Sequence, residues 1–197
     1  MSRYTISLAI LAVALSSTAA LGQEAVKWET NCAPQGCLLQ TEVLRGESGD
    51  PPDASDFHEY VGVDVALERQ TRKPAYFTFH VNPEADRDQG VSIAFTKTGS
   101  KADAAKVNLD SDGTSKLDVS DCDDKTCAVR VPLGLVKKTK DSRNLNLLEK
   151  FLKADDLLVL YTKGGKQYRT MIPLSSFQTE YQRVLTAEFG VANPGKK

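Results

Sequence analysis

Residues 60–67 read Tyr-Val-Gly-Val-Asp-Val-Ala-Leu, and this stretch decides the fold class. Apolar residues occupy every second position from Val61 to Leu67. Successive side chains of a β-strand point to opposite faces, so a period of two predicts a strand with one buried face.

Six further stretches show the same alternation or a short apolar run bounded by turn residues: Cys37–Leu44, Tyr76–Val81, Val91–Phe95, Ala128–Val131, Leu157–Tyr161 and Gln167–Ile172. Gly164-Gly165 lies between the last two, and both positions of a Gly-Gly pair tolerate positive φ, which predicts a two-residue hairpin. Seven or more short strands separated by turns favour a mainly β, antiparallel β-sandwich over a parallel α/β sheet.

Two short helices are expected, at about 146–154 and 175–188. Asn146 precedes Glu149 by three residues, which is the order of a capping box, and Ser175 precedes Gln178 in the same way. Apolar residues then recur at helical spacing in both segments, and we expect these stripes to face the core. Pro173 should end a strand, because proline cannot donate to a ladder, and Ser175 should cap the second helix.

The first 22 residues have the pattern of a cleaved signal peptide. Arg3 supplies a positive start, an uncharged apolar run extends from Ile6 to Leu15, and small residues follow as far as Gly22. A retained membrane anchor would need roughly 20 apolar residues, and this run is shorter. Cleavage after Ala20 is the alternative to cleavage after Gly22. The sequence therefore predicts export to the periplasm or the medium, a single domain over 23–197, and no transmembrane segment after cleavage.

Export decides how the four cysteines are interpreted. In an oxidising compartment, Cys32, Cys37, Cys122 and Cys127 are first a disulfide framework. Turn-forming residues inside each Cys-x4-Cys unit favour two local bonds, whereas chain entropy favours crossed pairing, at about 4–5 kcal/mol against about 2 kcal/mol for a short loop. A four-cysteine zinc site is a third interpretation, and its thiolates would have to survive oxidation.

Charge gives no indication of a nucleic-acid partner. Removing residues 1–22, which carry one cation and no anion, changes the net charge only from −1 to −2. The charges of both signs are interspersed, whereas nucleic-acid binding usually requires a basic stripe.

No catalytic motif is found. His58 and His80 are the two histidines, and neither lies in a sequence typical of a catalytic base or a metal ligand. The segment 108–113 matches the first half of a calcium loop, but Val119 stands where the bidentate glutamate should be, so an Asp-Gly hairpin turn explains it more simply. We therefore expect no catalytic residue, metal or cofactor.

Three segments carry a resemblance to a known family. They are Trp28-x3-Cys32-x4-Cys37-x2-Gln40, Asp121-Cys122-x4-Cys127-Ala128 and Met171-Ile172-Pro173-Leu174-Ser175-Ser176-Phe177. Together they resemble the invasion-associated locus B (IalB) family of exported alphaproteobacterial proteins, although the chain departs from the family pattern around 46–60 and 96–118. The resemblance implies an immunoglobulin-like β-sandwich without an established active site. Some relatives are associated with bacterial entry into host cells.

The resulting expectation is an exported, non-enzymatic β-sandwich that acts as a binding or envelope accessory module for an unknown protein or envelope partner. The resemblance alone adds an association with host-cell invasion to this expectation. The alternative is a periplasmic enzyme whose site is assembled from loops, using His58 and the carboxylates of 50–59. An exposed apolar patch or an unpaired sheet edge would favour the binding module.

Overall fold

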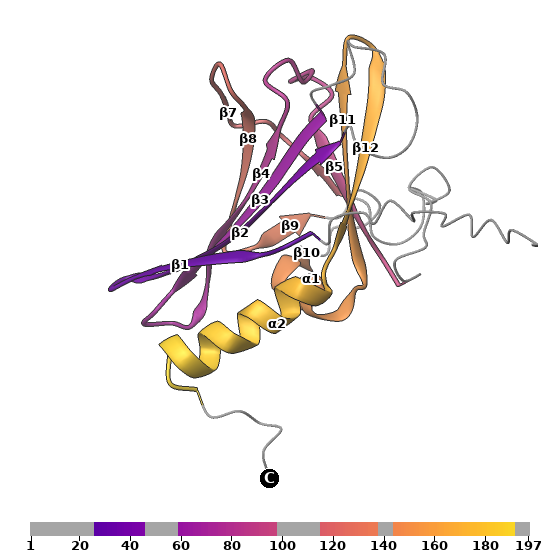
Figure 1. Ribbon diagram of the computed structural model, residues 1–197. Helices are drawn as coiled ribbons and strands as arrows, with labels where there is room; N and C mark the ends of the chain where they lie inside the picture. The colour runs from indigo at the N-terminus through magenta and orange to yellow at the C-terminus, as the bar shows by residue number, and fades with distance from the viewer. Residues whose placement is uncertain (1–25, 46–58, 98–114, 138–143, 192–197) are drawn as a thin grey trace, which may run out of the picture.

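The part of the chain that the structure describes folds into two antiparallel sheets, a small two-stranded ribbon and two helices (Figure 1). The computed structural model describes residues 26–45, 59–97, 115–137 and 144–191. Its strands are β1 (Glu29–Ala33), β2 (Gly36–Arg45), β3 (Glu59–Glu68), β4 (Lys73–Val81), β5 (Val91–Thr96), β6 (Ser115–Leu117), β7 (Asp121–Cys122), β8 (Cys127–Pro132), β9 (Leu135–Lys137), β10 (Asn144–Asn146), β11 (Asp156–Lys163) and β12 (Lys166–Pro173).

All seven strands expected from alternation are present. In β3, Val61, Val63 and Val65 are fully buried, as the period of two predicts. The hairpin between β11 and β12 turns at Gly164 and Gly165, whose φ values are +57° and +78°. Positive φ at both central positions is what a type I′ hairpin turn requires.

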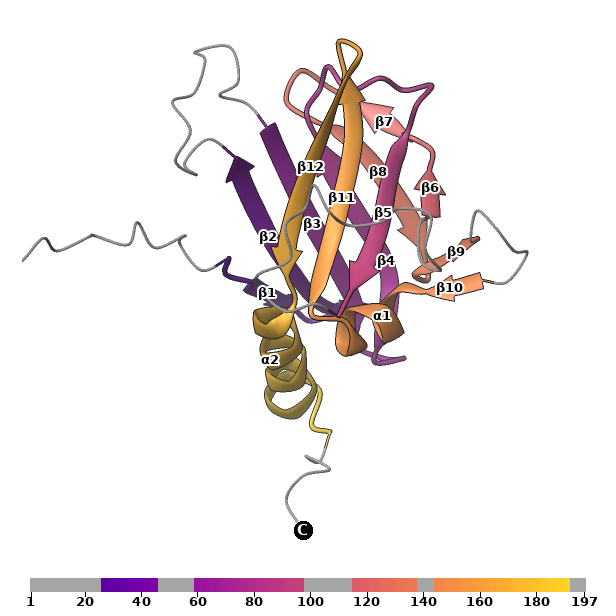
Figure 2. The same ribbon diagram turned by 90° about the vertical axis from the view of Figure 1, so that its right-hand side faces the viewer.

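The strands form a β-sandwich. The larger sheet has the order β1-β2-β3-β4-β8-β7, the smaller one has the order β12-β11-β5-β6, and β9 pairs with β10. The two large sheets face each other in both views (Figures 1 and 2). The first four strands form one continuous meander, whereas an immunoglobulin constant domain divides its strands as ABED and CFG. The sandwich is therefore shown, and the immunoglobulin-like label stays a prediction.

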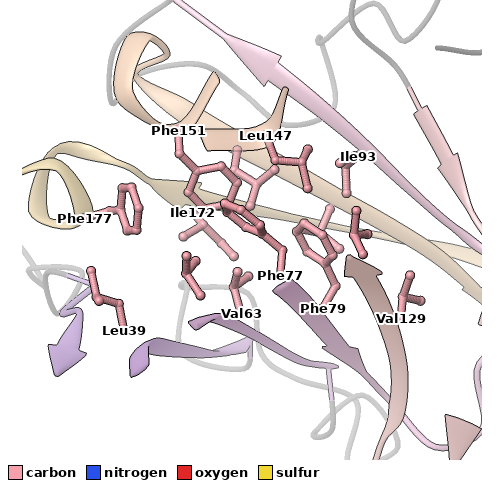
Figure 3. Packing of buried hydrophobic residues seen from close by; sticks show 14 of the residues in the cluster. Leu39, Val63, Phe77, Phe79, Ile93, Val129, Leu147, Phe151, Ile172 and Phe177 are labelled. Atoms are coloured by element: carbon pink, nitrogen blue, oxygen red, sulfur yellow. The ribbon is translucent and has the colours of Figure 1, made fainter. Parts of the chain in front are cut away.

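The core lies between the sheets and extends under the helices. Side chains of both inner faces point toward one another, with Val63, Phe77 and Phe79 on one side and Ile93 and Ile172 on the other (Figure 3). The aromatic rings of the two helices join this cluster directly. Burial of this continuous apolar surface is the main force that holds the two sheets together.

The helices lie together at one end of the sandwich (Figures 1 and 2). Helix α1 (Leu147–Lys153) begins after Asn146, whose side-chain oxygen accepts a hydrogen bond of 3.2 Å from the backbone N–H of Glu149. This confirms the expected cap. The Glu149 carboxylate does not complete the box, because it pairs with Lys153 at 2.7 Å.

Helix α2 (Ser175–Arg183) continues into a π-helical turn, η2 (Val184–Glu188), so the expected segment 175–188 is helical throughout. The expected packing is also confirmed, because Phe177 is fully buried and contacts the Trp28 and Phe151 rings at centroid distances of 4.8 and 5.1 Å. Pro173 ends β12, as predicted.

The prediction that Ser175 caps helix α2 is wrong. The N-cap residue is Leu174, which makes no side-chain cap hydrogen bond. Leu174 is fully buried, and its N–H donates to the Asp155 carbonyl at 2.8 Å, so this residue enters the core and fixes where the helix begins. The Gln178 amide donates instead to the Phe151 and Ala154 carbonyls at the end of α1. These contacts hold the Gln178 side chain against the end of α1, and no side-chain cap hydrogen bond forms at the start of α2.

Candidate functional site

Two disulfides close hairpins on opposite edges of the six-stranded sheet. Cys32 is bonded to Cys37 across β1 and β2, and Cys122 is bonded to Cys127 across β7 and β8. This is the local pairing rather than the crossed one. Because all four sulfurs are used in disulfides, they do not provide the thiolates of the zinc alternative.

His80 lies on the outer face of the same sheet and has an acidic neighbour. Its Nε2 is 3.0 Å from Oδ2 of Asp64 on the adjacent strand β3, and both side chains are about a quarter exposed, at 24% and 29%. Nearby, the Asp123 carboxylate accepts hydrogen bonds from the backbone N–H groups of Thr126 and Lys125, which lower its pKa; His80 contributes a smaller charge effect in the same direction.

A histidine oriented by a carboxylate supplies the base and the orienting group of a catalytic triad, which also needs a nucleophile. Among the described residues, no serine hydroxyl is hydrogen-bonded to His80, and all four cysteines are in disulfides. The same part of the chain contains no cluster of three potential metal-ligating side chains. His58, the carboxylates of 50–57 and the calcium-like segment 108–113 lie outside the described residues.

The large hydrophobic side chains that the described residues expose are Leu133 and Leu135, at 67% and 46%. They flank Gly134: Leu133 lies in the connection between β8 and β9, and Leu135 is the first residue of β9. We call residues 132–135 the leucine turn. Isolated exposed leucines are ordinary, so the backbone of this turn is what makes the pair informative.

Leu133 has φ of +55°, and Gly134 has φ of +63°. A bulky L-residue in the left-handed region costs of order 1–3 kcal/mol and persists only where surrounding contacts impose it. Such strain occurs often at functional positions, so the conformation of Leu133 makes the turn a candidate for function.

Three contacts hold the leucine turn in this conformation. The N–H of Leu133 donates to the Ala75 carbonyl at 2.9 Å, and the Gly134 carbonyl accepts from Leu147 N–H at 2.8 Å. A Cβ on Gly134 would lie 2.7 Å from the Phe77 ring, so glycine is required there. The turn is therefore anchored to the core while its leucines remain in solvent.

Next to the leucine turn, an arginine stacks on a tyrosine. The Arg130 guanidinium carbon lies 3.8 Å from the centre of the Tyr76 ring, and Tyr76 is the direct cross-strand partner of Pro132. We call the surface formed by Tyr76, Arg130, the leucine turn and Lys137 the leucine face. It combines aromatic, arginine and leucine side chains, and aromatic residues and arginine are enriched where protein interfaces gain most of their affinity.

No family model, curated protein or solved structure matches this chain in the three comparisons with known proteins. The helices of the described residues include none that is long and apolar enough to cross a membrane.

The sequence predicted the four disulfide cysteines but missed the leucine face. The signal was Pro132-Leu133-Gly134, a turn in which glycine alone would be expected to take positive φ. That Leu133 shares this conformation depends on contacts with Ala75, which is far away in the sequence.

Proposed function

We propose that the chain is an exported, non-enzymatic binding module that engages a protein or envelope partner through its leucine face. The observation that carries the proposal is Leu133, exposed at 67% in a left-handed conformation that the fold imposes. A solvent-exposed leucine gains nothing from this geometry in the free protein. A partner that buries it would gain about 1–2 kcal/mol, given that full burial of leucine is worth roughly 1.5–3 kcal/mol.

Two features support export. The first 22 residues have the signal-peptide pattern, and the two disulfides fit an oxidising compartment. The resemblance to the IalB family supports the same location and adds the immunoglobulin-like label and the association with host-cell invasion as further proposals. N-terminal sequencing of the exported protein should begin at Gln23, or at Leu21 if cleavage follows Ala20.

Site-specific photo-crosslinking in the producing bacterium tests the binding function. A photoreactive amino acid replaces Leu133 in one variant and Lys125 in the control. Lys125 is also exposed, but it lies on the β7–β8 turn, at the other end of the sandwich (Figure 1). A discrete cross-linked species at position 133, absent at position 125 and lost when Leu135→Ser is added, is expected. No species at position 133, or the same species at both positions, would contradict the proposal.

The alternative, a periplasmic enzyme, draws on one described observation, the His80–Asp64 pair at 3.0 Å. His80→Gln removes the basic nitrogen without disturbing the leucine face. On the binding proposal, this variant retains the cross-linked species at position 133. If cells that produce His80→Gln lose a function that the unchanged protein supports, while the cross-link at position 133 persists, the enzyme is favoured.

A further inference from the structure

The Arg130 side chain points to the chemistry of the partner. Its guanidinium is stacked on Tyr76, and no ion pair to it is found among the described residues. The hydrogen bond of 3.3 Å that links Arg130 to the Ser120 hydroxyl uses the backbone N–H, so it does not occupy the guanidinium. A guanidinium held over a ring loses rotamer freedom, and its N–H groups can still donate to a carboxylate.

The leucines lie close to this cation. Arg130 and Pro132 are exposed on the same side of β8, and residues two apart along a strand are separated by about 7 Å. Leu133 follows directly. On β9, Leu135 and Lys137 are both exposed, with the buried Val136 between them. Arg130 and Lys137 are the charged residues of the segment 130–137 that carries the two leucines, and both are cations.

We propose that the leucine face binds an acidic, extended segment of a partner protein in which an apolar side chain lies two residues from a carboxylate. The apolar side chain contacts Leu133 and Leu135, while the carboxylate pairs with Arg130. This inference rests on the proposed binding function and specifies its partner. Charge complementarity selects this occupant, because Arg130 and Lys137 would face the carboxylates of an acidic segment.

A lipid surface is the competing occupant, because exposed leucines and cations also bind anionic membranes. The structure favours the peptide, since Arg130 is held against the sheet by Tyr76 instead of extending freely beside the leucines. A fixed, planar donor suits the directional geometry of one carboxylate better than a diffuse layer of headgroups.

The test uses the mature chain and three fluorescent peptides. The first repeats Glu-Ser-Leu-Ser, the second replaces every Glu with Gln, and the third replaces every Leu with Ser. By fluorescence anisotropy at low salt, the first peptide should bind about tenfold tighter than either control peptide. Equal binding of the first two would overturn the role of the carboxylate, and equal binding of the first and third would overturn the role of the leucines.

Protein variants locate the binding. Arg130→Lys keeps the charge but loses the planar fork, so affinity for the first peptide should fall about fivefold. Arg87→Lys makes the same change on an exposed loop and should have no effect. Leu133→Asn removes the leucine but suits positive φ, and its backbone-matched control is Arg72→Asn at φ +57°. If the paired variants lose affinity equally, the leucine face is not the binding site.

Vesicle sedimentation distinguishes an acidic peptide from a lipid surface as the occupant. Sedimentation with phosphatidylglycerol vesicles, and with phosphatidylcholine vesicles as control, should leave the protein in the supernatant. Binding to the anionic vesicles that depends on Leu133, without selective peptide binding, would overturn the inference in favour of a membrane. If a partner protein cross-links at position 133 in cells but the purified chain does not distinguish the three peptides, the binding function stands and only this partner chemistry is refuted.

Discussion

Replacing Phe177 by alanine tests whether helix α2 is part of the core. The Phe177 ring is fully buried and lies 4.8 Å from Trp28, 5.1 Å from Phe151 and 5.9 Å from Tyr181, measured between ring centroids. Truncating a buried phenylalanine costs about 3–5 kcal/mol, and a site surrounded by rigid rings collapses poorly into the cavity. We therefore expect Phe177→Ala to lower the free energy of unfolding by about 4 kcal/mol, equivalent to a fall in melting temperature of about 8–16 °C for a domain of this size.

Urea unfolding measures this loss with two independent probes. Trp28 is the single tryptophan, and its ring contacts Phe177, so its fluorescence reports on this part of the core, while circular dichroism reports on the whole fold. Ser175→Ala is the matched control, because Ser175 is exposed and does not provide the cap; its effect should stay within about 0.5 kcal/mol. If Phe177→Ala lowers the free energy of unfolding by less than about 1.5 kcal/mol, with an unchanged urea slope, helix α2 is not packed into the core as described. If Phe177→Ala left stability unchanged but abolished the cross-linked species, the apolar stripe of α2 would be a binding interface.

Three further changes test other contacts. Asn146→Ala removes the cap of α1 and should cost about 1 kcal/mol in urea unfolding. Arg69→Ala removes the hydrogen bond of 2.6 Å to the Glu188 carbonyl, and should speed hydrogen exchange in η2 more than in β3. Burial raises the pKa of Asp156 above 3.8, so the folded chain holds this proton more tightly than the unfolded chain, and stability falls as pH rises through the folded-state value. Asp156→Asn should therefore reduce the fall in stability as pH rises above 3.8, measured by urea unfolding at several pH values; an unchanged slope would contradict this.

Strands were predictable from the sequence because their signal is local. Alternation in residues 60–67 places one face in the core whichever strand lies beside it, and Gly164-Gly165 turns by its own backbone preference. The two- and three-residue strands β6, β7, β9 and β10 were not predicted. So short a segment has no readable period, and it becomes a strand only because a neighbour supplies its hydrogen bonds.

The candidate site was less predictable because it is made by strand register. His80 meets Asp64 only because β3 and β4 pair with Gly62 opposite His80, which places Asp64 on the diagonal. No spacing along the chain encodes that contact. The same holds for Arg130 and Tyr76, which are brought together by the pairing of β4 with β8.

By itself the sequence determined the mainly β class, the positions of the longer strands and helices, and the cysteines available for disulfides. Each of these depends on residues within a few positions of one another, through pleat periodicity, turn chemistry or the Asn146 cap. The tertiary structure alone decided that Leu174 replaces Ser175 at the start of α2, because Leu174 is buried in the core. It also decided the strained conformation of Leu133, because the adjoining glycine packs against the Phe77 ring while Ala75 accepts the Leu133 N–H. Contacts between residues far apart in the chain override local preference wherever burial or close packing is worth more than the preference it opposes.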